Sequence, residues 1–385
     1  MHVVFLPKYY PGRRDPQLGE FIRRHAVAVA PYVQVSVVAV LKDPDMAVAY
    51  DEEIVDDDGV WTLRSYYRPV ERGPGIWRTP KNLLRYWRAA KRAWLRFRKE
   101  RGTPQLVHVN VLTRASLLAL RALRKERIPF LITEHSSEFM DGRWQRRGWL
   151  HRVFTRRAFR KARVTTVVSN RLGKALVDQG LVGFFEVVPN VLPIEQVQVA
   201  PRGSAFEALL VADLVDSVKN ISGVLEAMAL LRDALPKLRL TIVGGGVDER
   251  KLRGVSAGFN LEERVAFTGQ LSPTQTLACI ARSGFLIVNS RTETFSVVTG
   301  EALMLGKPVI ATRCGGPEAF INERNGMLIP VDNTAALVEA MKKLIAAHDD
   351  YDPAVIRATV DERYSAEVVG KQLFSIYQRV LAKRN

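Results

Sequence analysis

The sequence predicts an α/β protein made of two Rossmann-like, doubly wound domains in tandem. Strand-like and helix-like segments alternate along all 385 residues, a pattern typical of parallel sheets covered by helices on both faces. The length suits two domains, because a single domain usually holds ~100–200 residues. A proline-punctuated segment, Val187–Pro193, separates two such runs of alternation.

Several segments of the first half have the character of buried parallel strands, since they are short, rich in β-branched residues and apolar on both faces. Helical patterns lie between them, including Ser116–Glu126 and Asn170–Gln179. We therefore expect a parallel sheet here. Its expected strands are His2–Leu6, Val33–Val40, Leu106–Asn110, Phe130–Thr133 and Val164–Ser169.

The second half repeats this rhythm. Helical stretches at Ile221–Leu235, Pro273–Arg282 and Thr334–Ala347 separate short apolar segments. A second parallel sheet follows from the pattern. Its expected strands are Ala208–Leu214, Leu238–Val243, Val265–Thr268, Phe285–Asn289, Pro308–Thr312 and Met327–Ile329.

The predicted domain boundaries are residues 1–193 and 194–365. The stretch Ser365–Lys383 has helical spacing with no strand after it, and we expect residues 366–385 to cross back onto the first domain. In open α/β sheets, ligands bind beyond the carboxyl ends of the strands. Two facing domains would therefore share a cleft that holds the active site.

Composition narrows the class of protein. Residues 1–200 hold 35 Lys and Arg against 19 Asp and Glu, a net charge of +16, whereas residues 201–385 hold 22 and 21, a net charge of +1. The two cysteines, Cys279 and Cys314, form no CxxC pair, which disfavours disulfide scaffolds and cysteine-based zinc sites. No signal peptide and no transmembrane helix is expected, so the expected location is cytoplasmic.

The densest functional pattern is Asn289–Ala311. A strand is expected to end near its start, and a turn that carries Glu293 leads into a helix that carries Glu301 and is closed by Gly306. The turn should leave the amides of Phe295, Ser296 and Val297 free at a helix N-terminus. Such amides suit sugar hydroxyls or phosphate oxygens.

This pattern resembles the most specific motif of the two-domain (GT-B) retaining glycosyltransferases of family 4, or group 1. In that family, two glutamates separated by seven residues precede Ala-x-x-x-Gly-x-Pro-Val-Ile-Ala, as Glu293 and Glu301 do here. The resemblance runs over nearly the whole chain. Further matching segments are Val188–Val191, Ile242–Gly246, Val265–Gly269 and Cys314–Glu318.

The resemblance implies roles for residues of the second domain, as a nucleotide-sugar-binding domain. Glu293 would bind hydroxyls of the donor sugar, and Glu301 would bind the ribose, whose hydroxyl pair a carboxylate can accept. The backbone near Gly269 and Leu271 would contact the base. Lys219, expected at the start of a helix, matches the family's phosphate-binding lysine.

The first domain, by the same resemblance, would bind the acceptor and complete the site. Gly19 follows the first strand and a loop, and would let the backbone approach a diphosphate at a helix N-terminus. His135, at the end of an expected strand, resembles the family's active-site histidine, which lies near the donor sugar. Glu293 and His135 are therefore the candidate catalytic residues.

Two departures from the family pattern concern the phosphates. The first loop keeps one glycine, in Leu18-Gly19, where the family has a pair. Where the family has an arginine before its lysine, this chain has Asp213, which would repel a diphosphate. Either Asp213 points away, or Arg13 or Arg14 supplies the missing charge.

The resemblance implies a metal-independent, cofactor-free transferase that moves a hexose-type sugar from a UDP- or GDP-linked donor to a glycan or lipid-linked acceptor, in polysaccharide or glycolipid assembly. One alternative is a sugar-nucleotide epimerase or a phosphorylase of the same fold. A free-sugar product from the donor alone would favour an epimerase or hydrolase. Another is a non-catalytic scaffold or a nucleic-acid-binding protein that uses the basic half, although no nucleic-acid-binding motif is present.

Two basic amphipathic segments of the first domain suit an anionic membrane surface. In Ile76–Arg101, apolar residues at helical spacing alternate with arginines and lysines. The second segment is His151–Arg163, with six basic residues. We expect peripheral docking at the inner face of the membrane, against the alternative that the apolar positions face the core. Those of the first segment are Leu83, Leu84, Trp87, Ala90, Trp94 and Phe97.

Overall fold

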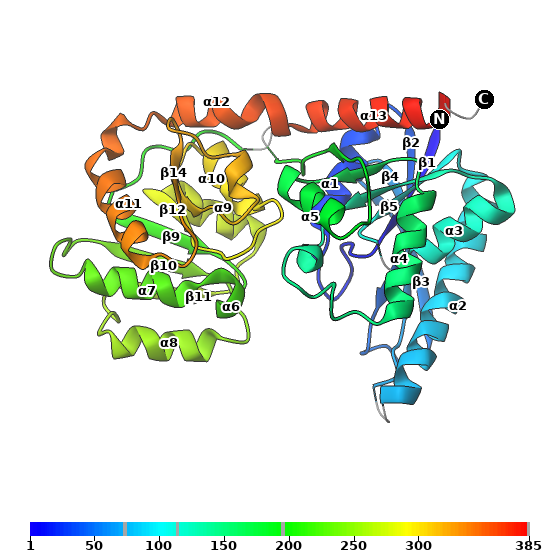
Figure 1. Ribbon diagram of the computed structural model, residues 1–385, viewed down its shortest axis with the longest axis horizontal. Coiled ribbons are helices and arrows are strands. Elements are labelled where there is room, and N and C mark those ends of the chain that lie inside the picture. The colour runs from blue at the N-terminus through cyan, green and yellow to red at the C-terminus, as the bar shows by residue number, and fades with distance from the viewer. Residues whose placement is uncertain (72–74, 113–114, 194–196, 383–385) are drawn as a thin grey trace. The chain divides into compact units, whose positions relative to one another are not determined.

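The chain forms two compact α/β units, each built around its own sheet, as the predicted fold class requires (Figure 1). The computed structural model describes residues 1–71, 75–112, 115–193 and 197–382. The first unit comprises Met1–Val191 and Ala366–Asn385, and the second comprises Leu192–Ser365. The predicted start of the second domain, residue 194, lies outside the described residues.

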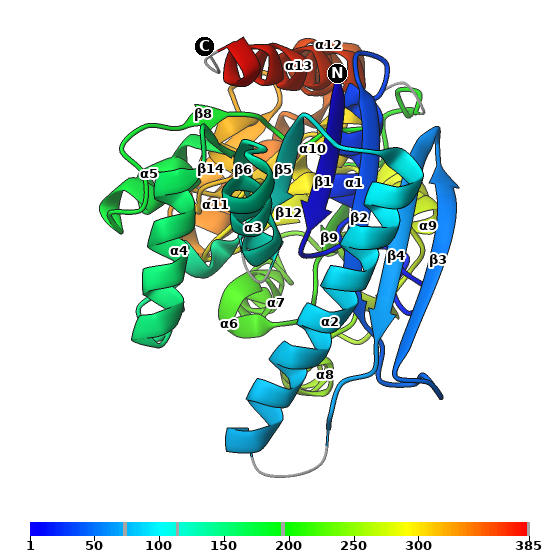
Figure 2. The ribbon, with the colours of Figure 1, turned by 90° about the vertical axis from the view of Figure 1, so that its right-hand side faces the viewer.

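The first unit holds an eight-stranded sheet in the order β3-β4-β2-β1-β5-β6-β7-β8. Its strands are β1 His2–Pro7, β2 Gln34–Lys42, β3 Tyr50–Asp57, β4 Val60–Tyr67, β5 Leu106–Asn110, β6 Phe130–Glu134, β7 Thr165–Val167 and β8 Glu186–Val187. Its helices are α1 Glu20–Val29, α2 Gly75–Arg101, α3 Ala115–Glu126, α4 Trp149–Lys161, α5 Asn170–Asp178 and α13 Ala366–Ala382. Figure 2 shows α2 running alongside β2 and β4, against which it packs.

One edge of this sheet departs from the predicted all-parallel arrangement. Strands β3 and β4 form an antiparallel hairpin that the sequence analysis missed, and β4 continues the sheet by pairing in parallel with β2. The hairpin turns at Asp58 and Gly59, both with positive φ, as a tight two-residue hairpin requires. Strand β3 is acidic and half-exposed, which protects a sheet edge against pairing with another chain.

The second unit holds a six-stranded sheet, parallel throughout, in the order β11-β10-β9-β12-β13-β14. Its strands are β9 Glu207–Val211, β10 Arg239–Val243, β11 Val265–Gly269, β12 Phe285–Val288, β13 Val309–Thr312 and β14 Gly326–Ile329. Its helices are α6 Asp216–Lys219, α7 Ile221–Leu230, α8 Glu249–Gly258, α9 Pro273–Arg282, α10 Val297–Met304, α11 Thr334–Ala346 and α12 Pro353–Tyr364. Because β9, β12 and β13 are neighbours, the segments that follow them meet at one edge of the sheet.

The C-terminal helix α13 belongs to the first unit, as predicted, and packs on α1. A Cβ atom on Gly370 would lie 2.1 Å from the carbonyl oxygen of Ala28, so only glycine allows the two helices to approach this closely. Further along α13, the buried hydroxyl of Tyr377 lies 2.7 Å from Nδ1 of His108 on β5. These contacts join the last helix to the core of the first unit.

Replacing Gly370 with alanine should separate α13 from α1 and lower the free energy of unfolding by about 1–3 kcal/mol, the usual cost of overpacking. Gly254 is the matched control, because it lies inside α8 and a Cβ there would meet nothing within 4 Å. Gly254→Ala should be neutral or stabilising by up to about 1 kcal/mol. Urea unfolding measures both changes, and equal effects would refute the close helix contact.

Candidate functional site

The candidate site of the second unit is assembled from three chain segments that follow β9, β12 and β13. Lys219 ends α6, which follows β9, and Glu293 lies in the turn between β12 and α10. Residues Cys314–Gly316 follow β13. Apart from the exposed Glu207 at the start of β9, these strands are mostly buried and apolar, and a polar residue follows within two positions of each strand end. The sheet thus brings together residues that are up to 97 positions apart in the sequence, Lys219 and Gly316 being the outermost.

The backbone of Glu293 is fixed by its neighbour segment. Its amide donates to the carbonyl of Cys314 at 3.1 Å, and its own carbonyl accepts from the amide of Gly316 at 2.9 Å. A Cβ atom on Gly316 would lie 2.4 Å from the carbonyl carbon of Phe295, which explains the need for glycine there. The Glu293 side chain is therefore held in place by the backbone on both sides of its residue.

Lys219 and Glu293 form an ion pair. The Lys219 Nζ lies 2.6 Å from Oε1 of Glu293, and the Ser290 hydroxyl donates to the same oxygen at 2.7 Å. Their side chains are 22% and 15% exposed, so the pair is reachable by a ligand but largely shielded from water. Lys219 ends the one-turn helix α6 rather than beginning a helix, which corrects its predicted position.

Arg291 organises the segment that carries Lys219, and the sequence analysis missed it. Its guanidinium donates to the carbonyl of Asp216 at 2.8 Å and to Oδ1 of Asn220 at 3.0 Å, thereby holding both ends of α6. It also pairs with Asp332 at 2.7 Å. The sequence offered one signal for this role, because Arg291 lies close to a strand end and two residues before Glu293.

The N-terminus of α10 holds the predicted amides of Phe295, Ser296 and Val297. None of the three donates to a protein acceptor within the described ranges. Ser296 has a φ of 70°, a conformation that costs a non-glycine residue about 1–3 kcal/mol and is found at functional sites. Its hydroxyl contacts that of Thr299 at 2.8 Å, and the Phe295 ring packs on Phe320. Local contacts thus maintain the strained turn.

The remaining donor-binding candidates lie on the same unit. Glu301 is half-buried on α10. Gly269 ends β11 with a φ of 75°, and its carbonyl accepts from the amide of Gly244 at 2.9 Å. A Cβ on Gly269 would meet open space, so its glycine is needed for the backbone conformation rather than for packing. Leu271, two residues on, is half-buried.

His135 lies at the end of β6 in the first unit, packed against the rings of Phe21 and His25 at centroid distances of 4.7 and 5.7 Å. Burial, followed by the nearby His25 and His108, holds its pKa well below the usual 6.5, so the imidazole is neutral. Neither ring nitrogen makes a well-formed hydrogen bond to the described residues, although the Asn190 side chain is close. An imidazole whose ring nitrogens make no well-formed hydrogen bond has hydrogen-bonding capacity left for a ligand.

Glu134, the neighbour of His135, is fully buried, and the sequence analysis gave it no role. Its Oε1 accepts from the amides of His135 and Ser136 at 3.0 and 2.9 Å, and its Oε2 accepts from the amide of Leu112 at 3.0 Å. Burial raises its pKa to about 7, against the three amides and Lys8, which lower it. The carboxylate joins the loops that follow β5 and β6, and thereby positions His135.

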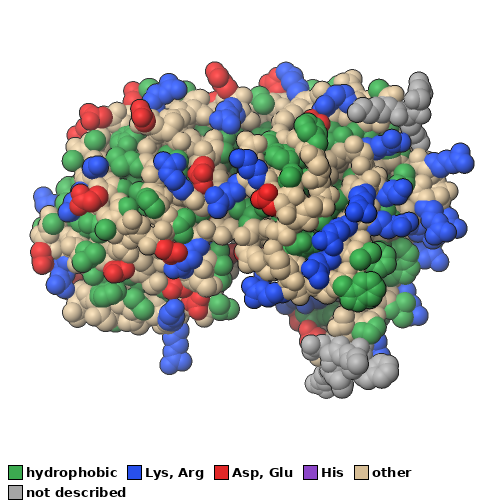
Figure 3. Space-filling model, viewed as in Figure 1, with side chains coloured by type: hydrophobic (Ala, Val, Ile, Leu, Met, Phe, Trp, Pro, Cys, Tyr) green, Lys and Arg blue, Asp and Glu red, His purple; other side chains and the backbone are tan. Residues whose placement is uncertain are grey.

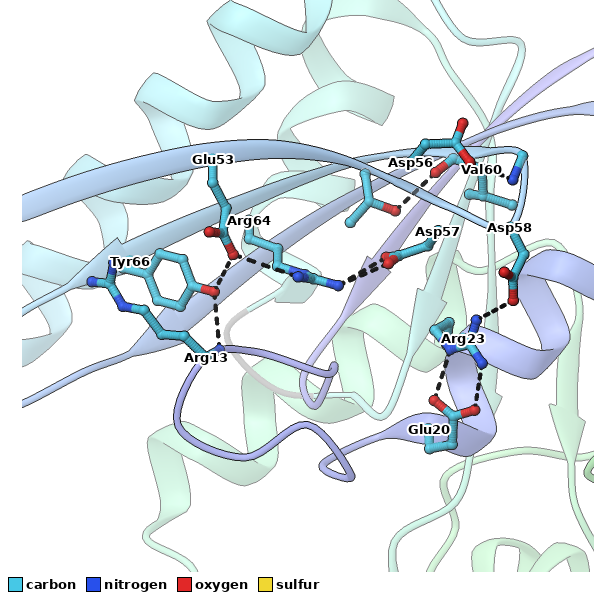
Figure 4. A network of polar contacts seen from close by, with 12 residues as sticks. Arg13, Glu20, Arg23, Glu53, Asp56, Asp57, Asp58, Val60, Arg64 and Tyr66 are labelled. Atoms are coloured by element: carbon cyan, nitrogen blue, oxygen red, sulfur yellow. Dashed lines mark hydrogen bonds and ion pairs between the residues drawn. The ribbon is translucent and has the colours of Figure 1, made fainter. Parts of the chain in front are cut away.

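Gly19 has a structural explanation of its own. It caps α1 with a φ of 74°, and a Cβ atom would lie 2.4 Å from the carbonyl of Tyr9. The first turn of α1 also carries Glu20, which pairs with Arg23 at 2.7 Å (Figure 4). The need for glycine at this position therefore follows from chain packing, without a diphosphate.

The two arginines that could offset Asp213 are already paired with carboxylates of the first unit. Arg13 bonds Asp43 at 2.7 Å and Asp51 at 2.8 Å, and it stacks on the Tyr66 ring near the network of Figure 4. Arg14 pairs with Asp45 at 3.0 Å. The Asp213 side chain itself is exposed. It stays a prediction that Asp213 points away from the diphosphate or that Arg13 or Arg14 supplies the missing charge. In the second case the arginine would have to leave its present carboxylate partner.

Two pockets of the molecule lie apart from the Lys219–Glu293 ion pair. A pocket of about 350 Å³ lies beside Arg13 and Arg14, and one of about 340 Å³ is lined in part by Asn220 and Arg291. Neither includes Lys219 or Glu293. Within the part of the chain that the structure describes, no group of three or more His, Cys, Asp or Glu residues is placed to hold a metal ion.

The structure is that of a two-domain α/β protein with a lysine–glutamate ion pair at the strand ends of its second sheet. Comparison with protein-family models identifies the family. The model described as "Glycosyl transferases group 1" matches residues 196–358, and "Glycosyltransferase Family 4" matches residues 21–196. The chain belongs to the glycosyltransferases of this family 4, group 1 type. The predicted family and the two-domain α/β fold are thereby confirmed.

Curated relatives match over part of the chain. A GDP-mannose-dependent alpha-mannosyltransferase of Mycolicibacterium smegmatis is 34% identical over 42% of this chain and 41% of its own length. A phosphatidyl-myo-inositol mannosyltransferase of Mycobacterium leprae is 26% identical over 50% of this chain and 53% of its own. The chain therefore spans about half the length of the curated relatives it matches.

Solved structures match over the whole chain. Sucrose-phosphate synthase from Thermosynechococcus elongatus superposes with a TM-score of 0.75 at 20% identity, covering 100% of both chains. Anabaena HepE in complex with UDP superposes with a TM-score of 0.75 at 17% identity, covering 98% of this chain and 100% of the other. At these identities the likeness establishes the fold.

Glu134→Gln should flatten part of the pH dependence of stability. In the folded protein Glu134 has a pKa of about 7, above the usual 4.5, so the native state binds more protons between these values. This group's contribution is therefore present below pH 4.5 and is lost as pH rises through 7, by about 3 kcal/mol in total. Urea unfolding of both proteins between pH 4.5 and 8 measures the difference.

The glutamine variant should be less stable at low pH, because an amide cannot satisfy all three backbone donors, while its deficit shrinks as the pH rises. The buried histidines act in the opposite direction but are common to both proteins, so they cancel in the difference. A deficit that stays constant from pH 4.5 to 8 would show that Glu134 does not titrate in this range.

Proposed function

We propose that this protein is a retaining glycosyltransferase that moves a hexose-type sugar from a nucleotide-sugar donor to a glycolipid or polysaccharide acceptor. The observation that carries the proposal is the Lys219–Glu293 ion pair, 2.6 Å long, at the joined ends of β9 and β12 and beside the strained entrance to α10. It provides a cation for phosphate and a carboxylate for sugar hydroxyls in one shielded place.

Donor binding would replace this ion pair. The Lys219 ammonium would turn to the diphosphate, and the Glu293 carboxylate would accept from the sugar hydroxyls. Each charge holds the other in position until the ligand arrives, which reduces the ordering cost of binding. Glu301 would bind the ribose, and the chain at Gly269 and Leu271 would meet the base. A UDP- or GDP-linked donor is supported by the UDP bound to HepE and the GDP-mannose named for the mycobacterial relative.

The chemistry needs stabilisation of a leaving diphosphate more than a strong base. As the anomeric bond breaks, negative charge grows on the phosphate, where Lys219 and the amides of Ser296 and Val297 would stabilise it. In front-face attack, which retains the configuration, the leaving phosphate takes the acceptor's proton. The neutral imidazole of His135 would donate a hydrogen bond to the transferred sugar, and Gly19 would bring backbone toward the diphosphate.

A lipid-linked acceptor at a membrane surface is the finer part of the proposal. The net charge of +16 in residues 1–200 favours approach to anionic lipid. The mycobacterial phosphatidyl-myo-inositol mannosyltransferase is a relative whose name describes a lipid acceptor. Within the described ranges, none of the helices combines the length and the hydrophobicity that a bilayer-spanning segment needs.

A donor panel tests the function. The purified protein is incubated with UDP-, GDP- and ADP-sugars without added metal, and thermal stability and nucleotide release are followed. One donor should stabilise the fold, by about 2.7 kcal/mol at a concentration 100 times its Kd. Glu301→Ala should abolish this stabilisation, whereas Glu262→Ala, an exposed glutamate of the same unit, should retain it.

The products separate the alternatives. Nucleotide release that requires an acceptor supports transfer, whereas conversion of donor alone to an isomer or a free sugar indicates an epimerase or hydrolase. If no donor stabilises the protein, the proposal is contradicted, and repulsion of the diphosphate by the exposed Asp213 would be the first explanation to test. A scaffold or a nucleic-acid-binding protein would then be the remaining hypotheses.

A further inference from the structure

The outer face of α4 carries the densest group of exposed large apolar side chains in the described first unit. Trp149 is 67% exposed, Leu150 54%, Val153 49% and Phe154 51%. Such a group is unusual on a soluble surface and marks an interaction site more often than chance exposure does. The helix is anchored by its opposite face, where Thr155, Ala158 and Phe159 are buried.

Helical geometry places the four apolar residues together with three cations. At 100° per residue, positions 149, 150, 153, 154, 157, 160 and 161 share an arc of about 140° on one side of α4. The first two turns of this arc are apolar, and the last turns carry Arg157, Arg160 and Lys161, all exposed. We call these seven residues the α4 face. Figure 3 shows hydrophobic and basic side chains adjoining over the region where Figure 1 draws α4.

The three cations of the α4 face have no carboxylate partner among the described residues, unlike the nearby Arg143 and Arg147, which pair with Asp141 and Glu138. Cations in the last turn of a helix are common, because they complement its dipole. That explanation leaves the exposed Trp149 and Phe154 unaccounted for. The apolar and basic parts together need a partner that is both apolar and anionic.

In the other basic segment, α2, some of the apolar side chains are buried and others are exposed. Ala90, Trp94 and Phe97 are buried against the sheet, so for these positions the core-facing alternative of the sequence analysis was right. Leu83 and Leu84 are 42% and 49% exposed. The predicted segment began at Ile76, but the side chains of residues 75–78 lie outside the described part. Among the described side chains, α2 adds only Leu95, 58% exposed, so the α4 face offers the larger exposed apolar group there and includes an exposed tryptophan.

We propose that the α4 face docks on an anionic lipid bilayer, with Trp149, Leu150, Val153 and Phe154 entering the interface and Arg157, Arg160 and Lys161 binding the headgroups. Amphipathic helices that lie in the membrane plane combine these two features, and tryptophan favours the interface. A second copy of the chain is a poor occupant, because a twofold contact buries the same face twice and the α4 face has no carboxylate to pair with its three cations. The inference rests on the proposed function in one respect, which is that docking would bring the enzyme to a lipid-linked acceptor in the same bilayer.

Vesicle binding tests the α4 face without donor or acceptor, so its outcome is independent of transfer activity. The full chain is sedimented with phosphatidylglycerol–phosphatidylcholine vesicles and with pure phosphatidylcholine vesicles, at low and high salt. Wild type should bind the anionic vesicles and release as salt rises. Trp149→Ser/Phe154→Ser should lose about tenfold or more in affinity. Arg157→Glu/Arg160→Glu should lose at least about fivefold per residue.

The matched control is Phe184→Ser/Leu230→Ser, which removes an aromatic and an aliphatic side chain that are 77% and 63% exposed elsewhere. It should bind vesicles as wild type does. Leu83→Ser/Leu84→Ser measures the contribution of α2. Unchanged thermal unfolding, and unchanged stabilisation by whichever donor the panel identifies, would show that the α4 variants remain folded.

Three results would overturn the proposal: no binding of wild type to anionic vesicles at low salt, undiminished binding by the α4 variants, or loss of binding only in the α2 variant. A concentration-dependent dimer in light scattering that Trp149→Ser/Phe154→Ser abolishes would instead assign the face to a second copy. A donor that is bound normally while vesicles are not would separate this failure from failure of the proposed function.

Discussion

The candidate site depends on the meeting of parallel strand ends. In a sheet where β9, β12 and β13 are adjacent and parallel, the three following segments emerge at one edge, and a lysine from the first can reach a glutamate from the second. The third segment then fixes the glutamate backbone through Cys314 and Gly316. Arg291 adds the last restraint by holding α6 from both ends. The ion pair is a consequence of topology, and its precision comes from these backbone contacts.

Most of the fold could be predicted because its strands are buried on both faces. Such strands appear in the sequence as uninterrupted apolar segments, and Leu106–Asn110 was predicted with its observed bounds. The hairpin β3–β4 was missed because its first strand is acidic and edge-exposed, so its sequence lacks the apolar signal on which the prediction relied. Similarly, α7 ends at Leu230 rather than Leu235, since a helical pattern does not show where a turn begins.

The site was less predictable than the fold, and the reason is distance along the chain. Glu293 and Glu301 belong to one local pattern, so their spacing could be read directly. The partners of Arg291 lie 41 to 75 positions away, at Asp332, Asn220 and Asp216, and no local pattern reports them. Glu134 presents the same difficulty, because its role is to hold the amide of Leu112 from another strand end. The donor-binding and catalytic roles themselves remain predictions.

The return of α13 to the first unit also governs the order in which the protein can be completed. Side chains of α13, including Val369, Leu373 and Tyr377, belong to the same core cluster as Val3 and Phe5 on β1. On the ribosome, the amino-terminal half must therefore wait with part of its core uncovered while the whole second unit is synthesised and free to fold. The first unit is thus synthesised first but completes its core last. Its exposed apolar surface is where chaperones would bind during synthesis.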